Sequence, residues 1–434
     1  MQGFRELGFI IIGNVSPTNH NPMTNRVKYL IPAIIALMMA ALVSCGKEEG
    51  EIVLEDNVEK TVFPKTRLSL TESEMSNIAP SNDYTFRFFR DNYQAETDML
   101  LSPLGYQQTL AMVCNVVKNG EALRENLGFK GESMEGVNTY FQHLIQALSG
   151  EAFSNELSLA NAFMRDVRAE KYPDSFINIL KSNYFVDYHE IEAKPLSEQP
   201  IGSRPEDIWC QDNTDGMIQT APIVIKEYET SLFNAFLFKG EWQDKFEKDQ
   251  TPGEFFSKPE RSVTTPFMRK DGKVNIYRGE EFSAVSLPFG DGTFDLSIIL
   301  PTARYNVGGV LEKLDSKAWE SLRGEFVRKE VRMVIPVFSM SYSKMQTLDY
   351  EFIDGIAPFK LIGQKATFAM NEDGASAASV TQAHVAIADL SSIVRKETFI
   401  ADSPFIYTIT ESGSGLILFI GVYSGADKEE MIQS

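Results

Sequence analysis

Two spacings of apolar residues run along the chain, and each predicts a different kind of element. A helical spacing of three to four residues predicts helices at 81–89, 108–117 and 172–183. Alternating or short apolar runs predict strands at 157–163, 282–288, 294–301 and 331–338. Gly290-Asp291-Gly292 stands between two of these strands and is a strong hairpin signal. Helices dominate the first third and strands the last, which predicts a single α+β domain rather than a regular alternation of strand and helix.

One stretch in the strand-rich part of the chain consists mostly of small residues. From Gly374 to Ala388 there is no Asp, Glu, Lys, Arg or Pro, although 23% of the chain is charged. A central strand donates its backbone N–H groups and packs alternate side chains, so it excludes Pro and charge. A flexible linker would also be rich in Ala, Ser and Gly. If the stretch is a strand, period two places these residues on one face: Ala375, Ala377, Ser379, Thr381 and Ala383.

The sequence of this stretch and of the segments on both sides of it resembles that of the serpin family. The run NEDGASAASVT at 371–381 resembles the serpin hinge, and FIADSPFIYTI with GLILFIGVY at 399–423 resembles the closing strands. SPL at 102–104, LRENLGF at 123–129 and NAFLFKGEW at 234–242 continue the match in order. The resemblance covers about residues 68–425. It implies one α+β domain at 67–427, with several helices, three β-sheets and an exposed reactive loop.

The resemblance also implies a function, which is inhibition of serine proteases as a suicide substrate. The protease cuts the loop and forms an acyl-enzyme, and the freed hinge then inserts into the main sheet before water releases the protease. Small, uncharged hinge residues favour insertion because a buried charge costs several kcal/mol. The resemblance assigns the hinge to Glu372, Gly374, Ala375, Ala377, Ala378, Ser379 and Thr381.

The position of the reactive bond follows less directly. Counting the family spacing from Glu372 places the cut between Ala388 and Asp389, whereas counting back from Pro404 places it near Ile393. The alternatives are Leu390 with Ser391 after it, and Arg395. Aliphatic residues at the cut suit elastase-like or subtilisin-like targets, and Arg395 would suit a trypsin-like protease.

The family's control of sheet opening usually pairs two serines with an Asn and a His. The matching positions here are Ser102, Gly105, Asn234 and Gln364, so a glycine and a glutamine replace two of the usual residues. Gln can still donate and accept hydrogen bonds. Trp242 is assigned to the same control region. In addition, Glu372 often has a Lys partner in the family, and the matching position is Val337.

Composition and motifs exclude most other chemistry. A net charge of −19 without a cluster of Lys and Arg argues against a nucleic-acid or heparin-type partner. The four histidines have no metal-binding spacing, and no phosphate-binding loop, dinucleotide fingerprint or G-x-S-x-G motif is present, so we expect no metal or cofactor. Ser341-Tyr342-Ser343-Lys344 fits the S-x-x-K motif of serine hydrolases, which leaves a hydrolase as a distant alternative.

The N-terminus reads as a targeting segment. Arg26 and Lys28 precede a short apolar run that ends at Cys45, and the residues before Cys45 resemble a bacterial lipobox. We therefore predict a signal segment at 1–45, with translation starting at Met23 or Met1, lipid attachment at Cys45, and a tether at 46–66. The acidic start of the tether resembles the surface-export signal of Bacteroidetes lipoproteins, which predicts an outer-membrane lipoprotein exposed at the cell surface.

Several points stay open. The expected partners are serine proteases of a host or a competing microbe, and the chain is expected to be a monomer that meets the membrane through its lipid alone. Cys114 and Cys210 either pair or stay as buried thiols. The main alternative function is a serpin that does not inhibit and acts as a binding module. The small hinge residues favour the inhibitor.

Overall fold

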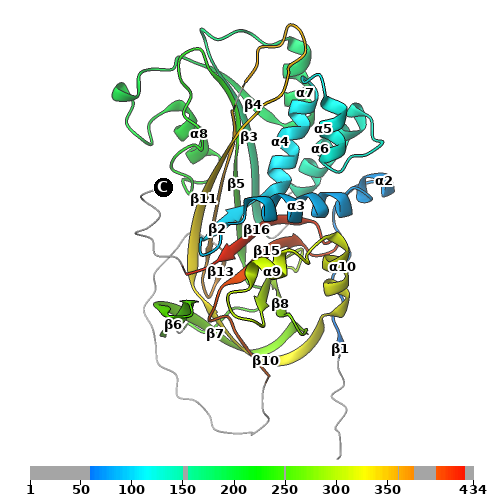
Figure 1. Ribbon diagram of the computed structural model, residues 1–434, viewed down its shortest axis with the longest axis vertical. Helices are drawn as coiled ribbons and strands as arrows, with labels where there is room; N and C mark the ends of the chain where they lie inside the picture. The colour runs from blue at the N-terminus through cyan, green and yellow to red at the C-terminus, as the bar shows by residue number, and fades with distance from the viewer. Residues whose placement is uncertain (1–58, 150–154, 249–250, 360, 376–396, 426–434) are drawn as a thin grey trace, which may run out of the picture. The chain divides into compact units, whose positions relative to one another are not determined.

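The structure is a computed structural model that describes residues 59–149, 155–248, 251–359, 361–375 and 397–425. All of these residues belong to one contiguous unit of the chain. They form two β-sheets with helices packed against them (Figure 1).

The six-stranded sheet contains the start of the small-residue stretch. Its strand order is β11-β12-β13-β5-β3-β4. Most neighbours are antiparallel, but β12 and β5 also pair with each other directly and in parallel. The strands are β3 (Glu156–Asp166), β4 (Val186–Ile191), β5 (Thr230–Glu241), β11 (Phe338–Thr347), β12 (Leu361–Met370) and β13 (Gly374–Ala375).

The ten-stranded sheet unites what the resemblance implied to be two sheets. The long strand β7 pairs with β6 through its first residues, with β10 through its middle and with β8 through its end, so the pairing is continuous. Its strands are β1 (Glu59–Lys60), β2 (Met99–Leu101), β6 (Pro252–Lys258), β7 (Arg261–Arg278), β8 (Phe282–Phe289), β9 (Phe294–Pro301), β10 (Val327–Pro336), β14 (Glu397–Ile400), β15 (Phe405–Glu411) and β16 (Ile417–Tyr423).

Helices cover both faces of the six-stranded sheet. α4 to α7 lie on one face and α8 on the other (Figure 1). Every residue of α4 is buried, which places this helix at the centre of the main core. A smaller apolar cluster lies between α8 and the sheet and includes Trp209, Cys210 and Phe233. The helices are α2 (Glu72–Met75), α3 (Ile78–Asn92), α4 (Pro103–Cys114), α5 (Gly120–Asn126), α6 (Met134–Leu148), α7 (Asp174–Tyr184), α8 (Pro205–Asp212), α9 (Val307–Leu311) and α10 (Ser316–Glu325), with a short 3-10 turn at Leu196–Glu198.

The α+β class and most predicted elements are confirmed, with one error. The helices predicted at 81–89, 108–117 and 172–183 correspond to α3, α4 and α7, and the predicted hairpin is β8–β9. The single strand predicted at 331–338 is wrong, because β10 ends at Pro336 and β11 begins at Phe338 in the other sheet. Val337 between them donates its N–H to the carbonyl of Pro266 at 2.8 Å. Apolar residues continue across this junction, so periodicity does not reveal it.

The N-terminal boundary of the fold lies before residue 67. Glu59 and Lys60 pair with Arg328 and Val327 of β10, and the hydroxyl of Thr66 donates to the Glu411 carboxylate at 3.1 Å. The predicted targeting segment and Cys45 lie outside the described residues. Among the helices that the structure describes, none combines the length and hydropathy needed to span a bilayer.

Cys114 and Cys210 are both buried free thiols and do not form a disulfide. They lie in different apolar clusters: Cys114 is the last residue of α4 and belongs to the main core, whereas Cys210 lies in α8 and belongs to the smaller cluster. Burial raises the pKa of each thiol to about 12, so neither is a reactive thiolate at neutral pH.

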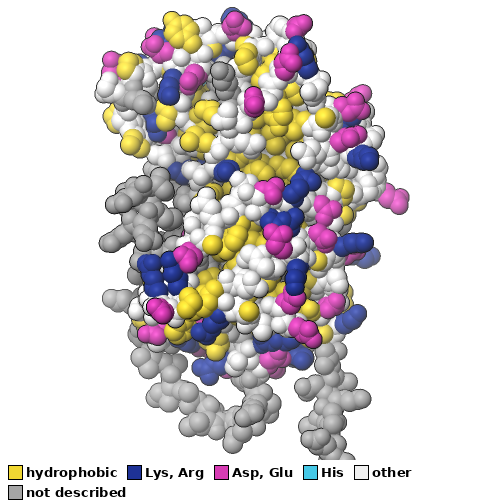
Figure 2. Space-filling view, in the orientation of Figure 1, with side chains coloured by type: hydrophobic (Ala, Val, Ile, Leu, Met, Phe, Trp, Pro, Cys, Tyr) yellow, Lys and Arg dark blue, Asp and Glu magenta, His cyan; other side chains and the backbone are white. Residues whose placement is uncertain are grey.

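Charged side chains of both signs are mixed on the surface. On the face drawn in Figure 2, Lys and Arg side chains occur in small groups with Asp and Glu nearby. Several form ion pairs, such as Arg304 with Asp402 at 2.7 Å and Arg278 with Glu397 at 2.8 Å. The first pair joins the segment after β14 to the loop after β9, and the second joins β14 to β7.

Candidate functional site

The small-residue stretch enters the six-stranded sheet through its first two residues. Ala375 pairs with Met370 of β12 on one side and with Gly240 of β5 on the other. Its side chain is fully buried, with 0% exposed. The stretch therefore begins between two strands that pair with each other directly farther along their length.

Gly374 makes this entry possible because of its backbone conformation. Its φ is +148°, which L side chains rarely adopt, and a Cβ there would overlap the carbonyl oxygen of Gly240. Asn371 closes the turn before it: the N–H of Asn371 donates to the Gly374 carbonyl at 3.0 Å, and the Asn371 carbonyl accepts from the Gly374 N–H at 3.2 Å. A tight turn thus reverses the chain from β12 into β13.

Trp242 fixes this turn from the end of β5. Its backbone N–H donates to the Asp373 carbonyl at 2.9 Å, and its indole Nε1–H donates to the Asn371 carbonyl at 2.7 Å. Glu372 is buried, and its carbonyl accepts from the Phe246 N–H at 3.0 Å. The turn is therefore held by the backbone and indole of the segment that follows β5.

Beyond the entry point, β5 and β12 close against each other in a seam. Residues Leu232–Leu237 of β5 pair in parallel with Ile362–Thr367 of β12. A strand that continued from Ala375 would have to part these pairs, and would then form a ladder with each strand. We call this paired region the seam.

Gln364 and Ser102 bridge the seam to α4 below it. The Ser102 N–H donates to Gln364 Oε1 at 2.7 Å, and Gln364 Nε2 donates to the Ser102 carbonyl at 2.9 Å. The Ser102 hydroxyl donates to the Leu418 carbonyl at 2.7 Å. Asn234 Nδ2 donates to the Thr109 hydroxyl at 3.0 Å. β5, β12, α4 and β16 therefore meet in one buried polar cluster.

Gly105 accounts for the glutamine at position 364. A Cβ on Gly105 would overlap the Phe236 ring and the Gln364 amide nitrogen. Gly105 therefore leaves the space that the Gln364 side chain fills to reach Ser102. The structure brings Ser102, Gly105, Asn234 and Gln364 together, whereas Trp242 stands apart from them at the end of β5.

We expect Gly105→Ser to destabilise the fold by about 2 kcal/mol, because an extra side chain in a filled core forces its neighbours to shift. The measurement is the free energy of unfolding in urea. Gly324→Ala is the control, since nothing lies within 4 Å of a Cβ on Gly324 of α10. Equal stability of Gly105→Ser and the parent would contradict the proposed fit of Gly105 and Gln364.

The Oδ1 atom of Asn234 is buried and has no hydrogen-bond partner among the described residues. Its amide nitrogen donates to the Gly105 carbonyl and to the Thr109 hydroxyl. The amide oxygen Oδ1 therefore remains without a donor. An unsatisfied buried acceptor is costly and calls for an explanation.

A strap of residues 218–225 crosses the seam on its outer face, and sequence reasoning missed it. Ile218, Ile223 and Ile225 belong to the apolar cluster that includes Phe233 of β5. On the β12 side, Lys365 Nζ donates to the Thr220 hydroxyl at 2.6 Å. Burial lowers the pKa of Lys365. The strap therefore contacts both strands of the seam, and the lone Lys in the apolar strand β12 was its one sequence signal.

The remaining predicted site residues lie outside the described residues. They are Ala377, Ala378, Ser379 and Thr381 of the hinge, and Ala388, Asp389, Leu390, Ser391 and Arg395 around the reactive bond. Within the described parts of the chain, no group of three or more His, Cys, Asp or Glu side chains is arranged to hold a metal ion.

The structure overturns the hydrolase alternative. Ser341 and Lys344 lie inside β11 rather than at the end of a strand. Residues three apart in a strand point to opposite faces of the sheet. The Lys344 amine therefore cannot act as the base for the Ser341 hydroxyl, as it could on a helix.

Comparison with known proteins identifies the family. The family model for serpins, described as serine protease inhibitors, matches residues 79–349 and 358–425. The chain belongs to the serpin family. Serpin-ZX of Arabidopsis thaliana is 24% identical to it over 361 residues, which cover 75% of this chain and 91% of that protein. The human leukocyte elastase inhibitor is 24% identical over 357 residues, which cover 75% and 93%.

Solved serpin structures share the fold. The thermophilic serpin tengpin in its native state matches with a TM-score of 0.68 and 21% identity, over 85% of this chain and 98% of that one. Thyroxine-binding globulin in complex with thyroxine matches with a TM-score of 0.70 and 18% identity, over 81% and 100%. The two sheets and the helices around them are therefore those of a serpin.

Proposed function

We propose that this serpin is a suicide-substrate inhibitor of serine proteases. The observation that carries the proposal is the position of Gly374 and Ala375, which already occupy the first paired positions between β12 and β5. A loop cut beyond this point has a strand register to follow and two partner strands to pair with.

The chemistry begins as ordinary proteolysis. The serine of the protease attacks a loop carbonyl, the peptide bond breaks, the new amine leaves with the C-terminal part of the loop, and the carbonyl remains bound to the protease as an ester. The part after the cut stays with the fold, because β14 pairs with β10. The part before the cut is then free to enter the seam with the protease attached.

The pairing already present predicts the register of the inserted strand. Ala375 pairs antiparallel with Met370 on one side and with Gly240 on the other. If the strand continues in this register, the residue six positions after Ala375 lies opposite the residues six positions before Met370 and Gly240. Thr381 would therefore lie between Gln364 of β12 and Asn234 of β5. Strand neighbours point to the same face, so the Thr381 hydroxyl would enter the buried polar cluster. There it would donate to Asn234 Oδ1, the acceptor left without a partner.

The targets we propose are elastase-like or subtilisin-like proteases, which would cut the loop at Ala388-Asp389 or at Leu390-Ser391; a cut at the alternative Arg395 would instead need a trypsin-like protease. The aliphatic residues of the loop support this choice. The similarity to the human leukocyte elastase inhibitor supports it as well.

A binding module is the second candidate. The shared fold with thyroxine-binding globulin in complex with thyroxine favours it. The seam argues for the inhibitor, because a module that never opens its sheet has no need of a buried small residue at Ala375 or of an open acceptor at Asn234.

We also propose that the chain is an outer-membrane lipoprotein with its lipid on Cys45. The lipobox-like sequence supports this. Cys45→Ser is expected to move the protein out of the membrane fraction and to abolish incorporation of labelled palmitate. A variant that keeps both the label and the membrane location would contradict lipidation at Cys45.

The test of function is to mix the protein with elastase-, subtilisin- and trypsin-like proteases and to separate the products in hot detergent. The proposal predicts a covalent complex with at least one protease and loss of that protease's activity. Clean cleavage of the loop with no complex, for every protease, would favour the binding module.

A further inference from the structure

The chain enters the fold at the same edge of the ten-stranded sheet where the reactive loop returns to it. On one side, β10 pairs with β7 along its whole length. On the other side, β10 pairs with β1 through Val327 and Arg328, and with β14 through residues 331–334. Only Lys329 and Glu330 separate the two pairings, so β1 and β14 lie about 10 Å apart along β10.

The directions of these two strands bring the tether and the loop to one point. β1 is antiparallel to β10, so the N-terminal end of β1 at Glu59 points toward Val331. β14 is parallel to β10, so the N-terminal end of β14 at Glu397 points toward Arg328. The tether and the last residues of the loop therefore join the sheet at the same gap, between Arg328 and Val331.

The end of the tether is fastened beside this gap by backbone, hydroxyl and ring contacts. The Thr61 N–H donates to the Phe326 carbonyl at 3.0 Å, and the Thr61 hydroxyl donates to Asn275 Oδ1 at 3.1 Å. The Phe63 ring packs edge-to-face on the Phe326 ring, with centroids 6.1 Å apart. The Arg323 guanidinium lies 4.5 Å from the centre of the Phe63 ring. These contacts fix the tether to the end of the fold that carries the loop.

Chain length limits how far the membrane and the cut can lie from this gap. If the lipid is on Cys45, 14 residues separate it from Glu59, and they span at most about 50 Å. The candidate cuts at 388–395 lie two to nine residues before Glu397, which is at most about 32 Å. The bond that is cut therefore lies close to the end of the fold that the anchor ties to the membrane.

We propose that the anchor restricts this serpin to proteases small enough to fit between the fold and the membrane. This restriction rests on the proposed function and on the proposed lipid at Cys45. A compact protease of about 250 residues is roughly 45 Å across, and an assembly of about 1000 residues is roughly 80 Å across. The smaller protease fits within the length of the extended tether. The larger one reaches the loop only from beside the fold, with the tether fully extended, so the partner is a single-domain protease.

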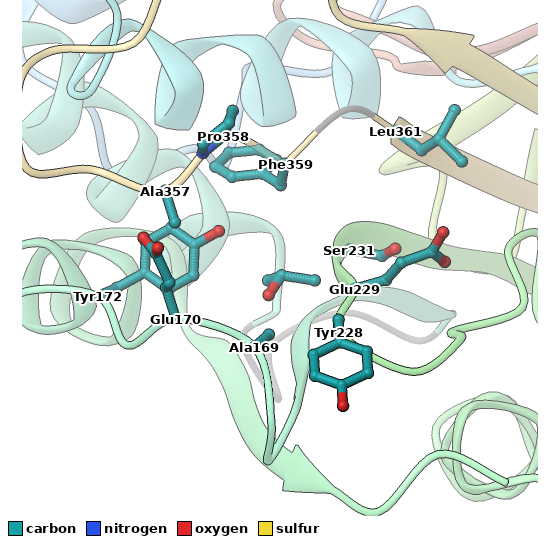
Figure 3. Close-up of a pocket in the computed structure, with 11 residues that line it drawn as sticks. Ala169, Glu170, Tyr172, Tyr228, Glu229, Ser231, Ala357, Pro358, Phe359 and Leu361 are labelled. Atoms are coloured by element: carbon teal, nitrogen blue, oxygen red, sulfur yellow. The ribbon is translucent and has the colours of Figure 1, made fainter.

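Size should limit the first attack and not the trapping that follows. By the register proposed above, the inserted strand runs toward Ser231 and Leu361, which are labelled in Figure 3. Ser231 lies nine residues along β5 from Gly240, which is about 30 Å. β4, which pairs with β3 beside that end of β5, lies at the upper end of Figure 1, whereas β1 and β10 lie at the lower end. A protease carried to the far end of the seam therefore leaves the space beside the membrane.

The test couples the chain from Cys45 onward to a maleimide lipid in phosphatidylcholine vesicles, so that it does not depend on lipidation in the cell. Cys114 and Cys210 are buried free thiols, which leaves Cys45 to react. A protease that forms the covalent complex in solution is used alone, and also joined, away from its active site, to an inert carrier about 80 Å across. The association rate and the yield of complex per cut are measured at the vesicle and in solution, where the Cys45 thiol is blocked with N-ethylmaleimide.

The carrier should slow association at the vesicle about tenfold more than it does in solution, and the yield of complex per cut should not change. Insertion of about 30 Gly and Ser residues after Lys47 should remove most of this difference, because a longer flexible tether lets the fold move away from the membrane. An equal effect of the carrier at the vesicle and in solution would overturn the proposal. A difference that the longer tether does not relieve would overturn it as well.

A second variant tests the attachment at β1. Thr61→Pro with Phe63→Ala removes the N–H, the hydroxyl and the ring that fasten the tether, so that its free part extends to Thr66 and gains about 25 Å. The additional slowing by the carrier should then fall to about threefold. Val62→Ala is the matched control, because Val62 is 90% exposed between the two changed residues and should behave like the parent.

The outcomes separate this inference from the proposed function. A double variant that keeps the full slowing of the parent would overturn the role of the attachment at β1. Absence of a covalent complex in solution, for every protease, would overturn the proposed function and this inference with it. A complex in solution whose rate at the vesicle does not depend on the carrier would overturn the inference alone.

Discussion

The substitution Ala375→Arg is expected to abolish the covalent complex while leaving the loop cleavable. Ala375 is fully buried between Met370 and Gly240, so an Arg side chain there would have to bury its charge or push the hinge out of the sheet. Burial of an unpaired charge costs several kcal/mol. A cost of that size shifts the partition between trapping and hydrolysis by about 100-fold or more toward hydrolysis.

The measurement is the number of inhibitor molecules consumed per protease inactivated, together with a gel of the products. Ala375→Val is the matched control, because it is uncharged and β-branched and so suits a strand. It should keep most of the inhibition. Covalent complexes formed by Ala375→Arg at the parent's efficiency would rule out insertion through this entry point.

The largest effect on stability is expected from Asp166→Asn, about 3 kcal/mol. Asp166 is buried, and its carboxylate accepts hydrogen bonds from the Arg168 guanidinium and from the N–H groups of Ala193 and Tyr228. Arg168 is 32% exposed, so the main cost arises at the buried Asp166 site, where the Asn amide nitrogen replaces a carboxylate oxygen and leaves buried N–H donors without an acceptor. Urea unfolding at pH 7 measures the loss. Glu227→Gln is the control, since Glu227 is the half-exposed second partner of Arg168 and should matter by less than about 1 kcal/mol.

The effect of Asp166 should depend on pH in a definite direction. The Arg168 guanidinium, followed by the backbone donors, holds the pKa of Asp166 well below its usual range in the folded protein. A depressed folded pKa stabilises the fold above the unfolded pKa of about 4, and this contribution is lost as pH falls below that value. The difference between the parent and Asp166→Asn should therefore be constant from about pH 5 upward and shrink below about pH 4. A constant difference at all pH values would contradict the role of the charge.

Local signals explain what the sequence predicts well. Pro103 after Ser102 starts a helix, and the Ser102 hydroxyl caps it by accepting from the Gly105 N–H at 3.3 Å. The motif and the apolar spacing predict this helix. The Gly290-Asp291-Gly292 turn determines a hairpin by its own conformational demands. The entry of Ala375 into the sheet fits the expectation drawn from its small, uncharged surroundings.

Long-range contacts explain what the sequence did not predict. The fit of Gly105 to Gln364 depends on residues more than 250 positions apart, and neither residue carries a local signal of the other. The Asp166 carboxylate and the strap at 218–225 likewise depend on partners that are distant in the sequence, Tyr228 for the carboxylate and Lys365 of β12 for the strap. The chain passes from one sheet to the other at Val337, inside an apolar run. The spacing of apolar residues does not change there, so it cannot reveal where one strand ends and the next begins.

The most direct test of the account is the thermal stability of the chain after a single cut between residues 388 and 395 by a protease that is not trapped. About ten inserted residues, each adding about 1 kcal/mol of net hydrogen bonding, would stabilise the cleaved form by roughly 10 kcal/mol. We therefore expect its unfolding temperature to exceed that of the intact chain by more than about 10 °C. An unchanged or lower unfolding temperature would show that the cut loop stays outside the seam, and would contradict inhibition by loop insertion.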